Sequence, residues 1–197
     1  MITLMLLFLK SMAMLGFLKR NSSEFSDPYT LCSLYVSFVR PHLEYCAILW
    51  NPVYNSHCIR IEKVQKNFTR YVFHKLNWQI DRLSYSTRCA LFGLSSLENS
   101  RKMFSVLFVR DLVHRHIQCP ELLELLNFYA PRRSLRGSFH LVINFRTNFM
   151  QDKSINRCAS ISNSFFNFID LFNLISRPSF KVQLLMNLIF KFCLYIK

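Results

Sequence analysis

Glycine is scarce in this sequence of 197 residues, which contains only Gly16, Gly93 and Gly137, with no two close together. Phosphate-binding loops of the P-loop and dinucleotide types need two or more glycines within a few residues, because the backbone must approach the phosphate closely. Acidic residues are also few: 11 Asp and Glu oppose 25 Lys and Arg, and the net charge is +14. These shortages exclude the two glycine-loop chemistries and favour an anionic partner, either nucleic acid or a membrane surface.

Recognisable catalytic patterns are absent too. The sequence has no HExxH or GxSxG motif, and a two-metal phosphoryl-transfer site would need carboxylates that converge within a few ångströms. Glu121 and Glu124 lie one turn apart on a short leucine-rich segment. We interpret them as surface residues whose negative charge is favourable near a helix N-terminus, not as metal ligands. His114, His116 and Cys119 form a metal-like group, but their HxHxxC spacing does not match that of zinc sites. We therefore expect no catalytic residue, no metal site and no cofactor in this chain.

Seven cysteines, an odd number without a C-x-x-C pair, fall mostly within apolar runs. This usage is typical of reduced, buried thiols in a cytoplasmic or nuclear protein rather than of a disulfide framework. The apolar first eighteen residues lack the charged start of a signal peptide, and Lys10 interrupts them. The apolar tail around Lys191 has about half of the ~20 residues that span a bilayer. We expect both ends to form core-facing helices in a protein that is not secreted, and association of the two apolar ends with a membrane is the alternative.

The positive charge is concentrated toward the two ends of the chain. Residues 1–78 carry nine basic and four acidic side chains, residues 79–130 carry six and five, and residues 131–197 carry ten and two. Arg outnumbers Lys by 15 to 10, and Arg pairs with phosphate through a bidentate fork. This distribution favours a nucleic-acid partner, and the alternative is a generally basic, solvated surface.

Long stretches with apolar residues at helical spacing predict a mainly α-helical chain. Asp27 and Pro28 mark a helix start, since Asp caps free amides and Pro suits the first helical position. Pro41 should either kink the helix that follows or separate two helices. The alternation in FHLVINFRTNF predicts a strand or a small β-hairpin near residues 138–149. Helices are expected over residues 3–18, 28–50, 56–74, 82–91, 96–116, 121–128, 155–168 and 179–192.

The segment 56–74 is the most informative of these helices. At 100° per residue, its apolar side chains share an arc of about 100° and its basic side chains share a separate arc of about 120°. The apolar arc comprises Ile61, Val64, Phe68, Tyr71 and Val72, and the basic arc comprises Arg60, Lys63, Lys66, Arg70 and His74. Glu62 is the acidic residue that opposes the basic arc within the helix. A cationic ridge with an apolar back suits a nucleic-acid backbone, and the alternative is a solvated helix face without a ligand.

Several stretches together resemble one protein family. They are SMAMLGFLKRN, DPYTLCSLYVSFVRPHLEYCAILWNP, RIEKVQKNFTRYVF, RCALFGLSSLENSR, CPELLELLNF, PRRSLR, FRTNF and IDLF, in consistent order over about residues 11–185. In these stretches the chain resembles the reverse transcriptases of jockey-like non-LTR retrotransposons, in the region just after the polymerase palm where the thumb begins.

The resemblance implies a thumb-like three-helix bundle over residues 1–78 and a helical C-terminal extension over residues 79–197. In that family the thumb grips the primer–template duplex largely through its phosphates, without reading base sequence. The catalytic aspartates of the family belong to a palm that would lie upstream of Met1. We therefore expect a fragment of an RNA-directed DNA polymerase that is not an enzyme by itself. The complete polymerase would use Mg²⁺, and the expected partners are RNA–DNA duplex or RNA and the missing palm and finger domains.

Basic residues in two groups are the predicted nucleic-acid contacts. The first group is Arg60, Lys63, Lys66, Arg70, Lys19 and Arg20, and the second is Arg132, Arg133, Arg136 and Arg146. Two other hypotheses compete with nucleic-acid binding. One is a basic amphipathic protein that lies on a membrane surface through its apolar ends. The other is a nonfunctional, truncated open reading frame that inherited a foldable pattern.

Overall fold

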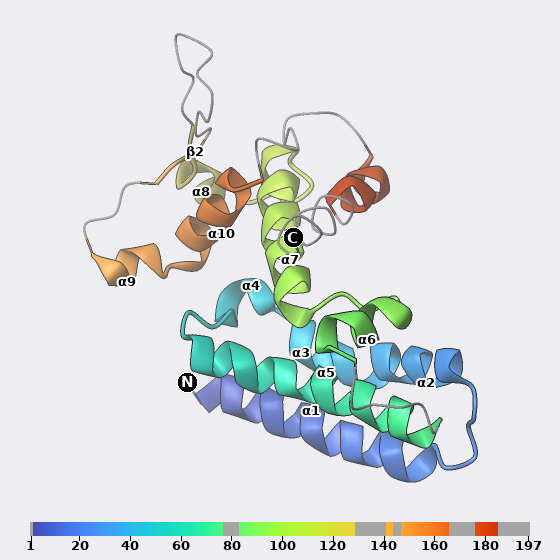
Figure 1. Ribbon diagram of the computed structural model, residues 1–197. Coiled ribbons are helices and arrows are strands. Elements are labelled where there is room, and N and C mark those ends of the chain that lie inside the picture. The colour runs from blue at the N-terminus through green and yellow to red at the C-terminus, as the bar shows by residue number, and fades with distance from the viewer. Residues whose placement is uncertain (1, 77–82, 129–140, 144–146, 166–175, 185–197) are drawn as a thin grey trace. The chain divides into compact units, whose positions relative to one another are not determined.

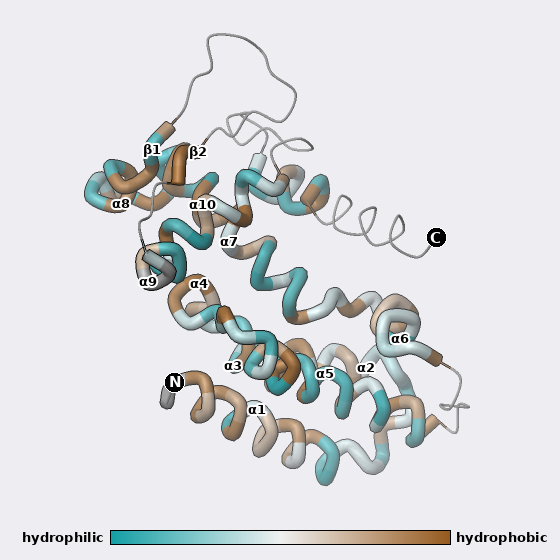
Figure 2. The backbone as a smooth tube through the Cα atoms, turned by 60° about the vertical axis from the view of Figure 1, so that its left-hand side comes forward, coloured by the Kyte–Doolittle hydropathy of each residue, from teal (hydrophilic) through white to brown (hydrophobic). Residues whose placement is uncertain are grey.

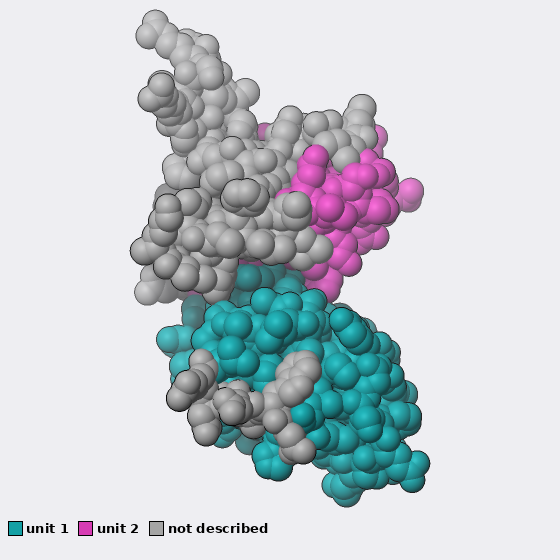
Figure 3. Space-filling view, turned by 45° about the vertical axis from the view of Figure 1, so that its right-hand side comes forward, with its two compact units in different colours: residues 1–101 teal, residues 102–197 magenta. Residues whose placement is uncertain are grey.

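The computed structural model describes residues 2–76, 83–128, 141–143, 147–165 and 176–184. The protein is mainly helical and contains a small antiparallel sheet, which confirms the expected fold class (Figure 1). The chain divides into two compact units, Met1–Arg101 and Lys102–Lys197 (Figure 3). Helix α7 (Leu97–Val113) begins in the first unit and continues in the second.

The first unit is a bundle of helices. In chain order these are α1 (Ile2–Asn21), α2 (Pro28–Leu34), the π-helical turn η1 (Tyr35–Val39), α3 (Arg40–Glu44), α4 (Ala47–Trp50), α5 (Asn55–Lys75), α6 (Tyr85–Leu91) and the start of α7. Helices α1 and α5 lie side by side and run in the same direction, whereas the segment from α2 to α3 packs against α1 in the opposite direction (Figure 1). The expected helix at 3–18 is thus extended to residue 21.

Helix α2 begins where the sequence predicts. The Asp27 carboxylate accepts hydrogen bonds from the backbone N–H and the hydroxyl of Thr30, at 2.8 and 2.7 Å. Pro28 occupies the first helical position, where its missing N–H costs no hydrogen bond. These local contacts confirm the predicted helix start.

Pro41 is accommodated by a π turn. The backbone N–H of Arg40 donates to the carbonyl of Tyr35, five residues back, and this wider turn directly precedes the proline. Such a turn gives room to a ring that would clash with the preceding turn of a regular α-helix. The helical path ends at Glu44, and Cys46 adopts a left-handed conformation with φ 50° before the short helix α4 begins.

The core of the first unit lies between α1, the α2–α3 segment and α5, and α6 adds to it. Its buried side chains are Leu15, Leu18, Leu31, Cys32, Tyr35, Val39, Leu43, Ile61, Val64, Phe68, Val72, Cys89, Leu94 and Leu97. Helix α5 alternates between hydrophobic and hydrophilic residues along its length (Figure 2). Because residues after α5 contribute to this core, the first unit continues to Arg101, whereas the expected boundary near residue 78 lies outside the described residues.

The second unit is also mainly helical. Besides the rest of α7, it contains α8 (Pro120–Glu124), β1 (Asn127–Phe128), β2 (Leu141–Val142), α9 (Asn148–Gln151), α10 (Ser154–Asn163) and a helical segment over residues 177–184. Helix α7 ends at Val113 instead of the expected residue 116. The physical reason is that Arg115 takes a left-handed φ of 57° and the N–H of Ile117 turns back to the carbonyl of Asp111.

The small sheet differs in its pairing from the expected hairpin. Strand β2 lies within the expected range 138–149, but its partner β1 precedes that range, with Asn127 opposite Val142 and Phe128 opposite Leu141. Asn163 of α10 holds the other side of β2: the Leu141 N–H donates to its side-chain oxygen at 3.2 Å, and its amide donates to the Leu141 carbonyl at 2.8 Å. This long-range pairing is not encoded in the local alternation.

The described cysteines are free thiols in different environments. Cys32, Cys89 and Cys158 are buried as expected, whereas Cys46 is exposed. Burial raises the pKa of the Cys32 thiol to about 11, so this thiol is protonated at neutral pH. Within the described ranges, no helix combines the length and the apolar character needed to cross a membrane.

Candidate nucleic-acid interface

Helix α5 buries a wider side than the sequence predicts. Four members of the expected apolar arc, Ile61, Val64, Phe68 and Val72, are buried, while Tyr71 is half-buried. Gln65, Thr69 and Phe73 are buried as well. The extra burial arises because α6 and the segment leading into α7 pack along this second flank of α5. About half of the helix circumference therefore faces the core.

Gln65 is the polar centre of this packing. Its side-chain nitrogen donates to the carbonyl of Ser95 at 3.0 Å and contacts the Cys89 sulfur at 3.5 Å. Its side-chain oxygen accepts a hydrogen bond from the Tyr35 hydroxyl at 3.2 Å. The Tyr35 ring in turn stacks on Phe68, with ring centroids 4.1 Å apart. The oxygen and the nitrogen of this buried side-chain amide are both hydrogen-bonded. Rotation of α5 about its axis would break these bonds and leave buried polar groups without partners, so the bonds fix the orientation of the helix.

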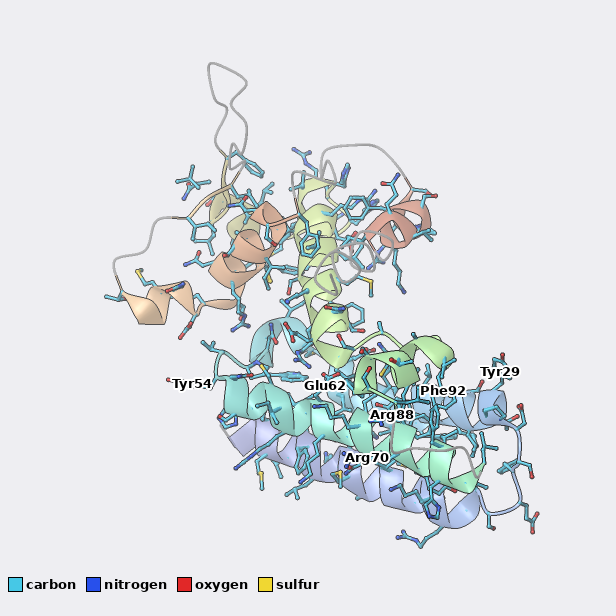
Figure 4. The ribbon with its side chains drawn as sticks, viewed as in Figure 1. Tyr29, Tyr54, Glu62, Arg70, Arg88 and Phe92 are labelled. Carbon is cyan, nitrogen blue, oxygen red and sulfur yellow. The ribbon has the colours of Figure 1, made fainter. Side chains whose placement is uncertain are left out.

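The remaining side of α5 carries the exposed basic residues. Arg60, Lys63, Arg70 and His74 are exposed, and we refer to these four residues as the α5 basic face. Across the part of the chain that the structure describes, no ion pair involves the three Lys and Arg members of this face. From Arg60 to His74 the face extends about 21 Å along the helix, and its three Lys and Arg members span about 15 Å of that length. Arg70 is drawn on α5 in Figure 4.

Glu62, which the sequence sets against the basic arc, is directed away from it. Its carboxylate accepts hydrogen bonds from the Tyr85 hydroxyl and from the backbone N–H of Leu97, the latter at 3.2 Å. Leu97 is the first residue of α7, where a negative charge is favourable. Burial, followed by the negative charge of Glu62, raises the pKa of the Tyr85 hydroxyl. The carboxylate is thus used inside the first unit and does not neutralise the α5 basic face.

Lys66 differs from the other predicted contacts on α5. It is half-buried, and its ammonium nitrogen lies 5.2 Å from the centre of the Tyr85 ring. A cation over an aromatic face is attracted by the negative electron density of the ring. Lys66 therefore packs on α6 at the edge of the α5 basic face.

Lys19 and Arg20 lie at the C-terminal end of α1, beside the end of α5. The Lys19 ammonium is 5.3 Å from the centre of the Tyr71 ring, and Arg20 is exposed. Lys75 approaches the same ring at 5.9 Å and donates to the backbone carbonyl of Ser22. Basic side chains at helix C-termini are stabilised by the partial negative charge there. Sequence reasoning missed Lys75, although its place in the last turn of α5 was a signal for this role.

The second predicted basic cluster, formed by Arg132, Arg133, Arg136 and Arg146, lies outside the described residues. It remains a prediction from the sequence.

Other arginines of the chain are used internally. Arg40 bonds to Glu44 at 2.6 Å and to the hydroxyl of Ser95 at 2.8 Å. Arg88 and Arg101 are buried, with bonds to a backbone carbonyl and to a side-chain amide of the first unit at 2.9 and 3.0 Å. These arginines therefore stabilise the fold, and fewer basic side chains are left that could bind an external anion.

In the second unit the buried Arg110 and Asp111 of α7 meet the helical segment 177–184, where the Arg177 side chain is 64% exposed. Asp111 is 2.8 Å from the guanidinium of Arg177, and Arg110 lies over the Phe180 ring at 4.7 Å. These contacts join α7 to the helical segment 177–184. His114 and His116 stack with ring centroids 6.2 Å apart, and the described residues contain no group of three His, Cys, Asp or Glu side chains placed to hold a metal ion.

Comparisons with known proteins give no assignment for this arrangement. No protein-family model matches the chain, and no curated protein or solved structure matches it significantly.

Proposed function

We propose that the chain is the thumb and post-thumb part of a non-LTR retrotransposon reverse transcriptase. In this proposal it binds primer–template duplex through the α5 basic face and carries no catalytic site of its own. The sequence resemblance over about residues 11–185 supports the origin. The observation that carries the binding role is the set of exposed cations on one rigid helix, from which the Glu62 carboxylate is turned away.

The proposed contacts are electrostatic. Arg60, Lys63 and Arg70 are spaced along one side of α5, so each can meet a different phosphate of a duplex backbone. Their backbone positions are fixed because the opposite side of the helix is anchored in the core through residues such as Gln65 and Phe68. Such contacts position a duplex without selecting its sequence, and they weaken as salt concentration rises.

The test replaces Arg60, Lys63 and Arg70 together by Gln in the full chain. Binding to a labelled RNA–DNA duplex is then measured by fluorescence anisotropy at several salt concentrations. Each lost phosphate contact should lower the slope of log K against log[salt] by about 0.9, so the triple variant should lose up to about 2.7. The loss should be equal for duplexes of unrelated sequence.

A matched control removes the same charge elsewhere. Lys10, Lys153 and Lys181 are exposed and belong to segments other than α5, and replacing these three by Gln should leave most of the affinity and of the salt slope in place. If the two triple variants bind equally well, binding follows net charge alone and the assignment to α5 is wrong. Upstream coding sequence that encodes a palm with paired aspartates would support the proposed origin.

A second candidate function rests on the outer side of α1. Met5, Leu6, Leu9 and Phe17 are between 45% and 54% exposed there, and Lys10 lies among them. Apolar side chains flanked by cations are typical of helices that lie on anionic membranes. Cosedimentation with vesicles of phosphatidylserine and phosphatidylcholine separates the two functions. Binding to these vesicles and not to duplex would favour the membrane surface.

A further inference from the structure

Tyr54 lies at the beginning of the helix that carries the α5 basic face. It directly precedes α5, its side chain is 71% exposed, and it makes no side-chain hydrogen bond that caps the helix. Its ring meets the ring of His57 edge to face, with centroids 6.2 Å apart. His57 is half-buried and lies in the first turn of α5, about one turn before the exposed Arg60. Tyr54 therefore lies at the N-terminal end of α5, one to two turns before Arg60, the first residue of the α5 basic face.

This end of the first unit is rich in exposed apolar side chains. Tyr45, Leu49, Val53 and Ile59 are 73%, 70%, 52% and 55% exposed. All four lie within residues 45–59, the stretch that contains Tyr54, and exposed apolar side chains that lie together are typical of interaction sites. The sequence between Glu44 and Glu62 contains no acidic residue. The stretch 45–63 thus combines the exposed Tyr54 ring and other exposed apolar side chains with Arg60 and Lys63 of the α5 basic face.

An unpaired nucleotide combines the properties that this surface fits. Its base has an apolar π face that stacks on an aromatic side chain, and its phosphate is attracted by nearby Lys and Arg. A blunt duplex keeps its bases stacked inside and presents phosphates to the protein. We propose that Tyr54 is a stacking platform for unpaired nucleotides that extend from the duplex held by the α5 basic face, an inference that rests on the proposed function.

The test compares two RNA–DNA duplexes of the same paired length in the full chain. One is blunt, and the other carries three unpaired adenosines at one end. The wild-type protein should bind the second duplex more tightly, and Tyr54→Ala should lose about 5- to 150-fold in affinity for it, the range found when a stacked base loses its aromatic partner. Affinity for the blunt duplex should stay unchanged, because Tyr54 is not among its proposed contacts.

Three variants separate stacking from other effects. Tyr54→Phe keeps the ring and should retain the preference for the unpaired end, whereas Tyr54→Leu keeps an apolar side chain without a ring and should lose it. Tyr29→Ala removes an equally exposed tyrosine, 76% accessible, at the other end of the first unit (Figure 4), and should behave like wild type. Circular dichroism checks that all variants keep their helical content.

The outcomes distinguish the two proposals. If the wild type binds the blunt duplex but shows no preference for the unpaired end, the stacking platform is wrong and the duplex-binding function stands. If it binds the duplex with the unpaired end but not the blunt duplex, the duplex-binding function is wrong and binding depends on the unpaired nucleotides. If it binds neither duplex, both proposals are overturned. A change in sedimentation of Tyr54→Ala with unaltered nucleic-acid affinity would identify the surface as a contact between two copies of the chain and overturn the platform.

Discussion

Gln65 offers a sharp test of how the core fixes the α5 basic face. Its side chain is fully buried, and it links the Tyr35 hydroxyl to the Ser95 carbonyl at 3.2 and 3.0 Å. Replacing Gln65 by Leu keeps a side chain of similar size but removes these two hydrogen bonds and the contact with the Cys89 sulfur. The Tyr35 hydroxyl is then left in a fully buried position without its partner.

The expected magnitude follows from these contacts. A buried polar group left without a partner costs about 1–3 kcal/mol. Ser95 is half-buried, so water can partly replace the hydrogen bond that its carbonyl loses. We therefore expect Gln65→Leu to lower the free energy of unfolding by about 2–4 kcal/mol. Tyr35→Phe keeps the ring that stacks on Phe68 but leaves the buried Gln65 side-chain oxygen without its donor, which should cost about 1–3 kcal/mol.

The double variant makes the reasoning refutable. In Tyr35→Phe combined with Gln65→Leu the stranded hydroxyl no longer exists, so the loss should be at least about 1 kcal/mol smaller than the sum of the single losses. Urea unfolding followed by circular dichroism measures all four proteins, with equal m-values as the check for two-state behaviour. Additive losses, within about 0.5 kcal/mol, would show that the two side chains are not coupled as described.

Two further predictions concern local chemistry. Replacing Asp27 by Ala should lower the urea midpoint at neutral pH, because it removes the side-chain and backbone hydrogen bonds from Thr30 that hold the pKa of the Asp27 carboxyl below its usual value. Since this pKa is lowered in the folded state, the urea midpoints of the variant and the wild type should become equal as the pH falls below about 4. A difference in midpoint that does not change with pH would contradict the helix cap. Iodoacetamide at pH 8 should alkylate the exposed Cys46 before the buried Cys32, whose pKa is about 11; equal rates in peptide mass spectrometry would contradict the described burial.

The sequence was a good guide wherever structure depends on near neighbours. The start of α2 at Asp27 and Pro28 follows from groups three residues apart, and the position of α5 follows from apolar spacing along one segment. The exposure of Arg60, Lys63 and Arg70 follows from the same periodicity, because one side of a helix is fixed once the other side is buried. A helix repeats every 3.6 residues, so such features can be read within a short window.

The sequence could not assign the residues whose roles depend on distant segments. Glu62 looks like a partner of the basic arc until Tyr85 and Leu97 meet it, 23 and 35 residues further along the chain. Lys66 falls on the basic arc by angle, yet it packs on Tyr85. Tyr54 carries no motif, and its exposed position at the N-terminal end of α5 is known only from the structure.

The sequence by itself determined the helical character of the chain, its excess of positive charge and the separation of apolar and basic residues on α5. Tertiary structure decided which cations remain for a partner. In the folded chain the Glu62 carboxylate accepts a hydrogen bond from Leu97, and Lys66 lies over the Tyr85 ring of α6. Arg40 is hydrogen-bonded to Ser100, 60 residues further along the chain. Tertiary structure also pairs β2 with a strand that precedes the alternating segment. The physical reason is the same in each case: burial leaves polar groups in need of partners, and only the packing of distant segments supplies them.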